Sequence, residues 1–232
     1  MKNLALAFCS IRPKQLTDSI CDYREHEYFR SIQQIERILP DSFDLVVCEN
    51  TIDDEKQLKN RELAEYLSNI EMVSLGSSGN IGTVNKGMGE LLMLSSALEE
   101  LDIDKYVNIT YISARHLLTC PYVFERTERL QKDAIISNPD FVMMDGTVEE
   151  SHKGGLYNDM IFSMRSKTMR EYSDYSKKYV SFDQRQVGSE QILFNFINEN
   201  DIEYEWLDTL GVIRNDWQKN GKILDVNNFH IC

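Results

Sequence analysis

The sequence predicts an α/β fold in which helices flank a central mixed, mostly parallel sheet. Strand-like apolar runs alternate with amphipathic helical segments through the first 110 residues, a pattern typical of a parallel sheet covered on both faces. The composition, 42% hydrophobic over 232 residues, supports a sizeable core. No Pro-, Gly- or Ser-rich linker and no block of charge divides the chain, so we expect one domain over residues 1–232.

The first half of the chain contains four expected strands with helices between them. The run at residues 4–10 is apolar throughout, as in a strand that is buried on both faces. Apolar residues at helical spacing, followed by Pro40, predict the first helix. The expected strands are residues 4–10, 43–48, 71–75 and 106–112, and the expected helices are residues 22–39, 53–67 and a segment that ends near residue 98.

The second half of the chain alternates less regularly, which favours a mixed sheet with a different role. The helix at residues 189–198 begins with Ser189 as its expected cap and has Glu190 in its first turn. The polar tail, residues 216–232, reads as a loosely packed arm. The other expected elements are helices at residues 121–132 and 166–179 and strands at residues 141–144, 159–164 and 203–207.

The bulk properties exclude several classes of partner. A net charge of −13 argues against nucleic acid or an anionic membrane surface as the main partner. No stretch approaches the roughly 20 apolar residues of a membrane span. The short apolar start runs directly into Arg12 and Pro13, which indicates a buried strand rather than a signal peptide. The 5 scattered cysteines form no CxxC pair and predict reduced thiols and a cytoplasmic protein.

The glycine-rich stretch at residues 76–97, GSSGNIGTVNKGMGELLMLSSA, lies between an expected strand and an expected helix. A helix start offers free N–H groups and a positive dipole end, so it attracts phosphate. The spacing fits neither GxGxxG nor GxxxxGK[ST], which disfavours a simple dinucleotide or P-loop enzyme. An ordinary glycine-rich loop before a capped helix would read the same way.

Ligands of α/β sheets bind beyond the carboxyl ends of the strands, so the residues that follow each strand are the candidates for a site. The candidates by this criterion are Ser10, Arg12, Glu49, Asn50, Asn80, Gly82, Asn85, Lys86, Ser113, Arg115, His116 and Asp145.

The order of these segments resembles that of the GT-A-fold glycosyltransferases, which use nucleotide sugars. The resemblance rests on the turn Ser10-Ile11-Arg12, the pair Glu49-Asn50 and the segment NIGTVNKGMGE, and it covers most of the chain through short motifs. It implies a GT-A-like Rossmann-type sandwich, with residues 1–118 binding the nucleotide sugar and residues 119–232 binding the acceptor. Ser10, Arg12, Glu49 and Asn50 would then hold the base and ribose.

The sequence departs from this family at the metal site. The Asp-x-Asp motif that holds a divalent metal in most members should follow the fourth strand, whereas Asp102 and Asp104 precede it and read as a solvated turn. Arg115 and His116 occupy the expected place and could bind the diphosphate without a metal, although Arg115 could equally pair with a surface acid. Binding of Mn²⁺ or Mg²⁺ stays open. Asp145 ends a strand, and His230 resembles the late histidine that completes the metal site in some members.

Glu190 is the candidate general base. Members of the family that invert the anomeric centre place a base at the start of a late helix, and Gly188-Ser189-Glu190-Gln191 resembles that motif. A base there would take the proton of the acceptor hydroxyl. An acid in the first turn also favours the helix dipole, so capping alone explains Glu190 as well. Asp145 is the alternative base.

The resemblance therefore implies transfer of a sugar from a nucleotide-diphosphate donor to a hydroxyl of a glycan acceptor, with inversion and without a required metal. The tyrosine- and lysine-rich segment at residues 172–179, together with Tyr157, is either an acceptor platform or an amphipathic helix with half-buried rings. Two other classes stay open, a sugar-phosphate nucleotidyltransferase and a non-catalytic nucleotide- or glycan-binding module. The turn Ser-Ile-Arg-Pro is too short for the basic, glycine-rich loop of a nucleotidyltransferase.

Overall fold

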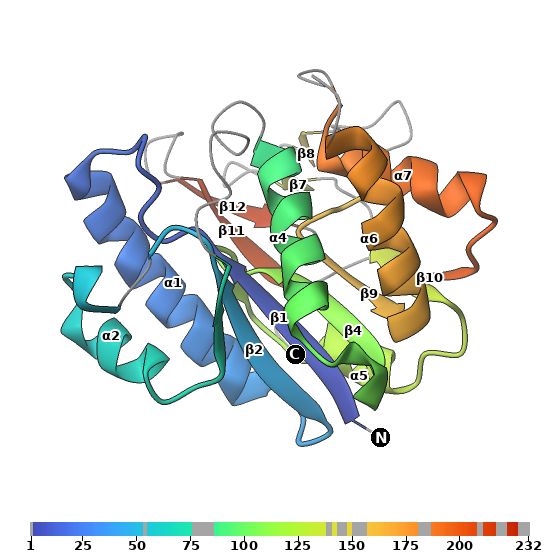
Figure 1. Cartoon of the computed structure of the whole chain (residues 1–232), viewed down its shortest axis with the longest axis horizontal. Helices are drawn as coiled ribbons and strands as arrows, with labels where there is room; N and C mark the ends of the chain where they lie inside the picture. The colour runs from blue at the N-terminus through green and yellow to red at the C-terminus, as the bar shows by residue number, and fades with distance from the viewer. Residues whose placement is uncertain are drawn as a thin grey trace.

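A computed structural model gives the fold of the chain. It describes residues 2–52, 55–75, 86–137, 141–142, 148–149, 157–180, 187–207, 211–216 and 222–226. The predicted class is confirmed: a seven-stranded sheet, mostly parallel, is flanked by helices (Figure 1).

The main sheet has the strand order β10-β6-β9-β4-β1-β2-β3, in which β9 runs antiparallel to both of its neighbours and every other pairing is parallel. Its strands are β1 (Lys2–Cys9), β2 (Phe43–Glu49), β3 (Met72–Ser74), β4 (Tyr106–Ser113), β6 (Ala134–Ser137), β9 (Ile161–Arg165) and β10 (Tyr204–Leu207).

The helices cover the two faces of this sheet because β1 is apolar on both sides. Leu4, Leu6 and Phe8 belong to a core that α4, α6 and α7 complete. Ala5 and Ala7 belong to the opposite core, with α1, α2 and α5. The helices are α1 (Asp18–Ile38), α2 (Arg61–Leu67), α4 (Lys86–Glu100), α5 (Tyr122–Glu128), α6 (Ser166–Val180) and α7 (Ser189–Glu199), with short 3₁₀ turns η1 (Glu55–Gln57) and η2 (Ile103–Lys105).

A smaller antiparallel sheet lies beside the main one, with the order β5-β11-β12-β7-β8. It joins a short strand that follows the end of β4 to strands from the C-terminal part of the chain. Its strands are β5 (Leu117–Leu118), β7 (Phe141–Val142), β8 (Val148–Glu149), β11 (Val212–Asp216) and β12 (Lys222–Val226).

Several expected elements differ from the structure. The expected helix at residues 53–67 is a 3₁₀ turn followed by α2, because the side chain of Asn60 caps α2 at its N-terminus. The strand expected at residues 141–144 is β7 and belongs to the small sheet. The main sheet instead contains β6, between β10 and β9, which we did not predict. The prediction of a loosely packed arm at residues 216–232 is wrong for β12, because β12 pairs with β11 and β7.

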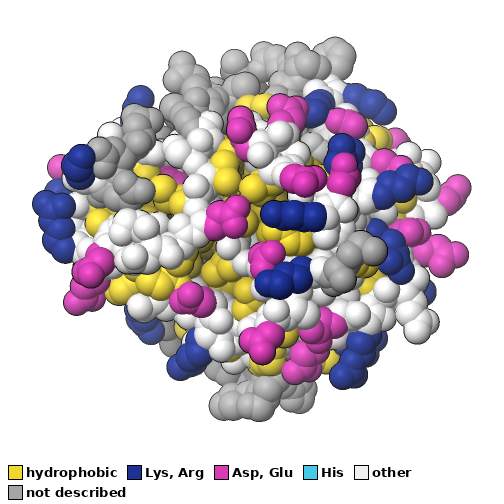
Figure 2. Space-filling model, turned by 60° about the horizontal axis from the view of Figure 1, so that its bottom comes forward, with side chains coloured by type: hydrophobic (Ala, Val, Ile, Leu, Met, Phe, Trp, Pro, Cys, Tyr) yellow, Lys and Arg dark blue, Asp and Glu magenta, His cyan; other side chains and the backbone are white. Residues whose placement is uncertain are grey.

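On the underside of the molecule, the acidic and basic side chains of the described residues are mixed and form no patch of one sign (Figure 2). Figure 2 shows this end, where acidic and basic side chains are interspersed with hydrophobic atoms. Among the described residues no helix is sufficiently long and apolar to cross a membrane.

Candidate functional site

Residues from separate parts of the chain meet at the edge of the main sheet where β1, β2, β3 and β4 end. Because β9 runs in the opposite direction, the segment before β9 lies at this same edge. The Ser113 amide donates to the Met160 carbonyl at 2.7 Å, and the Ala114 amide donates to the Phe8 carbonyl at 3.0 Å. The ends of β1 and β4 and the start of β9 are therefore joined into one edge.

Ser10 and Asn50 form the β1–β2 part of this edge. The Ser10 hydroxyl donates to Asn50 Oδ1 at 2.7 Å and lies 3.9 Å from the sulfur of Met93 on α4. The guanidinium of Arg24 donates to the Ser10 carbonyl from α1. The structure thus brings two predicted site residues together, between the sheet and α4.

Glu49 holds the turns that present Ser10 and Asn50. Its carboxylate is fully buried and accepts the Ile11 amide at 3.2 Å and the Thr51 amide at 2.6 Å. Burial raises the pKa of Glu49 to about 7, while the Thr51 and Ile11 donors oppose that rise. In this arrangement the carboxylate binds groups of the protein itself, so its role is to fix the two turns.

Arg12 faces α1. Its guanidinium binds Asp22 at 3.0 Å, Asp18 at 3.2 Å and the carboxylate of Glu25, and only 14% of the side chain is exposed. Its backbone amide donates to the Thr51 hydroxyl at 2.8 Å. In this conformation three carboxylates satisfy Arg12, so contact with a ribose would need their rearrangement.

Arg115 and His116 are buried in the turn after β4, toward α1. The Ser31 hydroxyl of α1 donates to the His116 carbonyl at 2.5 Å. Burial raises the pKa of Glu27 on α1, and the positive charge of Arg115 opposes that shift. Ser113, by contrast, is only partly buried at the end of β4. The guanidinium predicted to meet phosphate therefore lies close to a carboxylate.

Lys86 is the first residue of α4 and lies at the same sheet edge. Its Nζ pairs with Glu90 Oε1 at 3.1 Å, and 67% of the side chain is exposed. This combination offers a cation and a helix N-terminus together, as the sequence predicted. The predicted donor residues Asn80, Gly82 and Asn85 lie outside the described residues.

Glu190 lies beside a second carboxylate that the sequence did not reveal. The expected cap Ser189 is wrong, because Gly188 is the N-cap of α7 and the Ser189 hydroxyl donates to Asp159 Oδ2. Desolvation and the negative charges of Glu190 and Glu90 raise the pKa of Asp159 to about 8. A buried carboxyl with a raised pKa thus lies close to the predicted base Glu190, an arrangement typical of acid–base sites.

The contact between α4 and α7 at Gly87 sets the position of this pair. A Cβ on Gly87 would lie 2.6 Å from Ser189 Oγ and 2.9 Å from the Ser189 backbone nitrogen. We expect Gly87→Ala to lower the free energy of unfolding by about 1–3 kcal/mol in urea titrations, since α4 must move from α7. Ser96→Ala on the same helix measures the gain in helix propensity without a clash. A Gly87→Ala variant as stable as Ser96→Ala would contradict the tight contact.

Whether the protein uses a metal stays a prediction. Among the described residues, no group of three or more His, Cys, Asp and Glu side chains is placed to hold a metal ion. Asp102 and Asp104 belong to the solvated turn at the start of β4, as predicted, and Asp104 pairs with Arg170 at 2.7 Å. The alternative base Asp145 and the late His230 lie outside the described residues.

The tyrosine-rich helix is part of the core rather than a platform. On α6, Tyr172 is 1% exposed and Tyr175 is 7% exposed, and Tyr175 donates to Glu199 at 2.7 Å. Tyr157 instead joins a separate aromatic cluster beside β10. An amphipathic helix is thus the correct interpretation of residues 172–179.

No model of a known protein family matches the sequence, and no curated protein matches it. Solved structures do resemble the fold. A "putative nucleotide-diphospho-sugar transferase" from Desulfovibrio desulfuricans G20 has a TM-score of 0.54 and 14% identity, over 89% of this chain and 80% of that one. A protein from Aquifex aeolicus VF5 whose name gives no activity has a TM-score of 0.50 and 12% identity, over 98% and 95%.

A "putative glucose-1-phosphate thymidylyltransferase" from Bacillus anthracis matches with a TM-score of 0.49 and 13% identity, over 89% of this chain and 86% of that one. Identities this low establish a likeness of fold alone. The chain therefore has a mixed α/β fold similar to that of the Desulfovibrio protein.

Proposed function

We propose that the chain is a glycosyltransferase that moves a sugar from a nucleotide-diphosphate sugar to a hydroxyl of a glycan acceptor. The observation that carries the proposal is the pair Asp159 and Glu190, at the edge of the sheet where the parallel strands end. The pair lies near the cation of Lys86, because Gly87 of α4 packs directly against Ser189 of α7. A base beside a phosphate-binding helix start is what sugar transfer from a diphosphate requires.

The proposed step uses Glu190 as the base. The acceptor oxygen bonds to the anomeric carbon while its proton passes to the Glu190 carboxylate. The bond from that carbon to the diphosphate oxygen breaks, and the nucleoside diphosphate leaves with the electron pair. Attack from the face opposite the leaving group inverts the anomeric centre. Burial and the negative charges of Glu190 and Glu90 raise the pKa of Asp159 to about 8, which favours its protonated form at neutral pH.

The donor is placed along the edge from β2 to α4 in this proposal. Ser10 and Asn50 contact the base and ribose, on turns that Glu49 fixes. Lys86 and the start of α4 receive the diphosphate, with Arg115 as the second predicted cation. We route no step through a metal, and the candidate metal residues Asp145 and His230 lie outside the described residues.

The two other classes are separable from this one. A non-catalytic module would bind a nucleotide or glycan without releasing product. A nucleotidyltransferase would form a nucleotide sugar from a sugar phosphate. Neither class needs a base at Glu190, whereas the proposed transfer does.

The first test measures donor binding and turnover. We expect the wild-type protein to release nucleoside diphosphate from at least one member of a panel of nucleotide sugars, assayed with and without Mn²⁺. We expect Lys86→Ala to weaken binding of that donor about tenfold in calorimetry, because a charge-assisted contact to phosphate is lost.

Lys167→Ala is the matched control, because Lys167 on α6 is likewise paired with a glutamate one turn away, at 3.7 Å. It should bind the donor as the wild type does. The absence of product release, of binding and of a thermal shift with every nucleotide would exclude the proposed function. Equal loss in both lysine variants would exclude a specific role for Lys86.

A further inference from the structure

An aromatic cluster that the donor site does not use lies beside β10. Trp206 is 41% exposed, and its ring centre lies 6.1 Å from that of Tyr157 and 6.5 Å from that of Tyr204. Phe194 of α7 packs against Tyr157, with ring centres 5.1 Å apart. An indole is large and apolar, and leaving it so exposed at a packed aromatic cluster points to a ligand-binding surface.

The cluster is continuous with the carboxylate pair. Phe194 follows Glu190 by four residues on α7, so the two side chains share one face of that helix. Tyr157 precedes Asp159 by two residues in the segment before β9. The residues of the candidate base and of the aromatic cluster are thus held by the same two segments.

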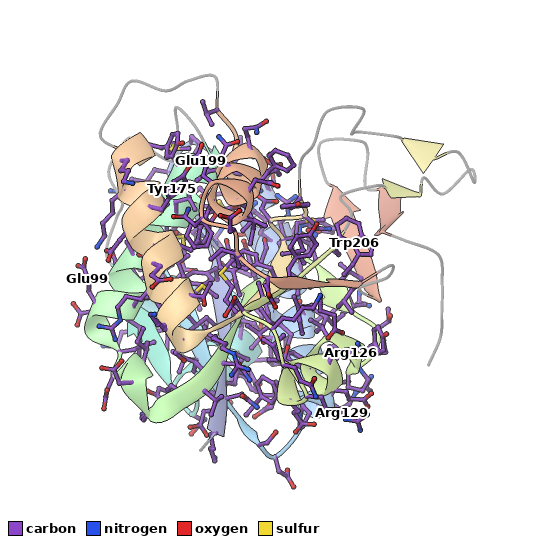
Figure 3. The ribbon with its side chains drawn as sticks, turned by 90° about the vertical axis from the view of Figure 1, so that its right-hand side faces the viewer. Glu99, Arg126, Arg129, Tyr175, Glu199 and Trp206 are labelled. Carbon is purple, nitrogen blue, oxygen red and sulfur yellow. The ribbon has the colours of Figure 1, made fainter. Side chains whose placement is uncertain are left out.

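The order of strands places the cluster on the far side of the carboxylates from the donor residues. β10 is separated from β1 by β6, β9 and β4, which is a distance of about 19 Å at the usual spacing between strands. The carboxylate pair, at the start of β9, lies between them. Figure 3 shows Trp206 on this flank of the molecule, apart from Tyr175 and Glu199.

We propose that Trp206 is the stacking surface for a sugar ring of the glycan acceptor, with the half-buried Tyr204 beside it and the buried Tyr157 supporting both rings. The inference rests on the proposed transferase function, and it adds where the acceptor lies and that the acceptor is an oligosaccharide that extends from the carboxylates to β10. Sugar rings stack their C–H faces on aromatic rings and bond to hydroxyls at the rim. The hydroxyl of the half-buried Tyr204, to which the Tyr157 hydroxyl donates at 3.4 Å, supplies such a rim.

The nucleobase of the donor is a poorer occupant for this surface. A base that stacked on Trp206 would lie about 19 Å from β1, which ends beside Ser10, and about 24 Å from β2, which ends beside Asn50, on the wrong side of the carboxylates. A second strand paired to the edge of β10 is also disfavoured, because Lys132 Nζ binds the Tyr204 carbonyl at 2.8 Å. Capping a strand edge with a lysine opposes edge-to-edge pairing.

The test is binding to an array of immobilised oligosaccharides, which includes chito-, cello-, malto- and manno-oligosaccharides and their monosaccharides. We expect the wild type to retain at least one oligosaccharide and Trp206→Ala to bind it at least about tenfold more weakly. Tyr23→Ala is the matched control, because Tyr23 on α1 is the other exposed large aromatic among the described residues, at 50%. It should bind as the wild type does.

The outcomes separate this inference from the proposed function. Trp206-dependent glycan binding without donor turnover would sustain the surface and reject the transferase. Donor turnover together with glycan binding that Trp206→Ala leaves unchanged would reject the surface and sustain the transferase. No glycan bound by the wild type, or a loss of self-association in Trp206→Ala by sedimentation velocity, would overturn the inference, the latter because Trp206 would then contact a second copy.

Discussion

Glu190→Gln is expected to lower kcat for release of nucleoside diphosphate by about 10²–10⁴-fold, because the amide cannot accept the proton of the attacking hydroxyl. Binding of the donor should stay within about twofold of the wild type, since the side chain keeps its shape and lies beyond the diphosphate in the proposed complex. Stopped assays of nucleotide release, with donor affinity measured by calorimetry, separate these two effects.

Two further variants decide what a loss of activity means. Glu199→Gln changes an acid at the other end of α7 and can still accept the Tyr175 hydroxyl, so it should be fully active. Asp159→Asn imitates the protonated carboxyl that the structure favours at neutral pH, and it should cost much less than Glu190→Gln. Full activity in Glu190→Gln would remove Glu190 from the mechanism, and a severe loss confined to Asp159→Asn would transfer the role of base to Asp159.

The sequence predicted strands β1 to β4 well because each is a short, mostly apolar run between turns. β1, β2 and β4 are largely buried, so they appear in the sequence as short, mostly apolar runs rather than as alternating patterns. It missed β6, a four-residue strand whose neighbours in the sheet, β9 and β10, come from much later in the chain. Whether so short a segment forms a strand depends on its pairing with distant segments, and the local sequence does not show that pairing.

The candidate site was predicted in part, and its largest omission has a geometric cause. Searching the ends of strands finds Ser10 and Asn50, because those strands are parallel. Asp159 precedes its strand, and it reaches the site only because β9 runs antiparallel to β4. Strand direction was the missing information, since nothing local to Asn158-Asp159 distinguishes it from an ordinary turn. The side-chain directions of Arg12 and Arg115 were equally hidden, because both depend on acids of α1.

The buried carboxyl of Glu49 should make the stability of the protein fall as pH rises. Its pKa is about 7 in the folded state, above the ordinary 4.5, so folding takes up a proton between these values. The stabilisation is complete below pH 4.5 and is lost as pH rises through 7. At about 1.4 kcal/mol per pKa unit, Glu49 should lower the free energy of unfolding by roughly 2–3 kcal/mol between pH 5 and pH 8.

Urea titrations of wild type and Glu49→Gln across this range isolate the effect, because the amide cannot ionise. The stability of the variant relative to wild type should rise from pH 5 to pH 8. Asp22→Asn is the control: hydrogen bonds from Lys59 and Arg12 lower the pKa of Asp22 below its ordinary 3.8, so its curve should run parallel to that of the wild type from pH 5 to pH 8. Parallel wild-type and Glu49→Gln curves would mean that the carboxylate stays ionised in the folded state. Its hydrogen bonds to the Ile11 and Thr51 amides would then outweigh the desolvation, and Glu49 would hold the site turns as a permanent charge.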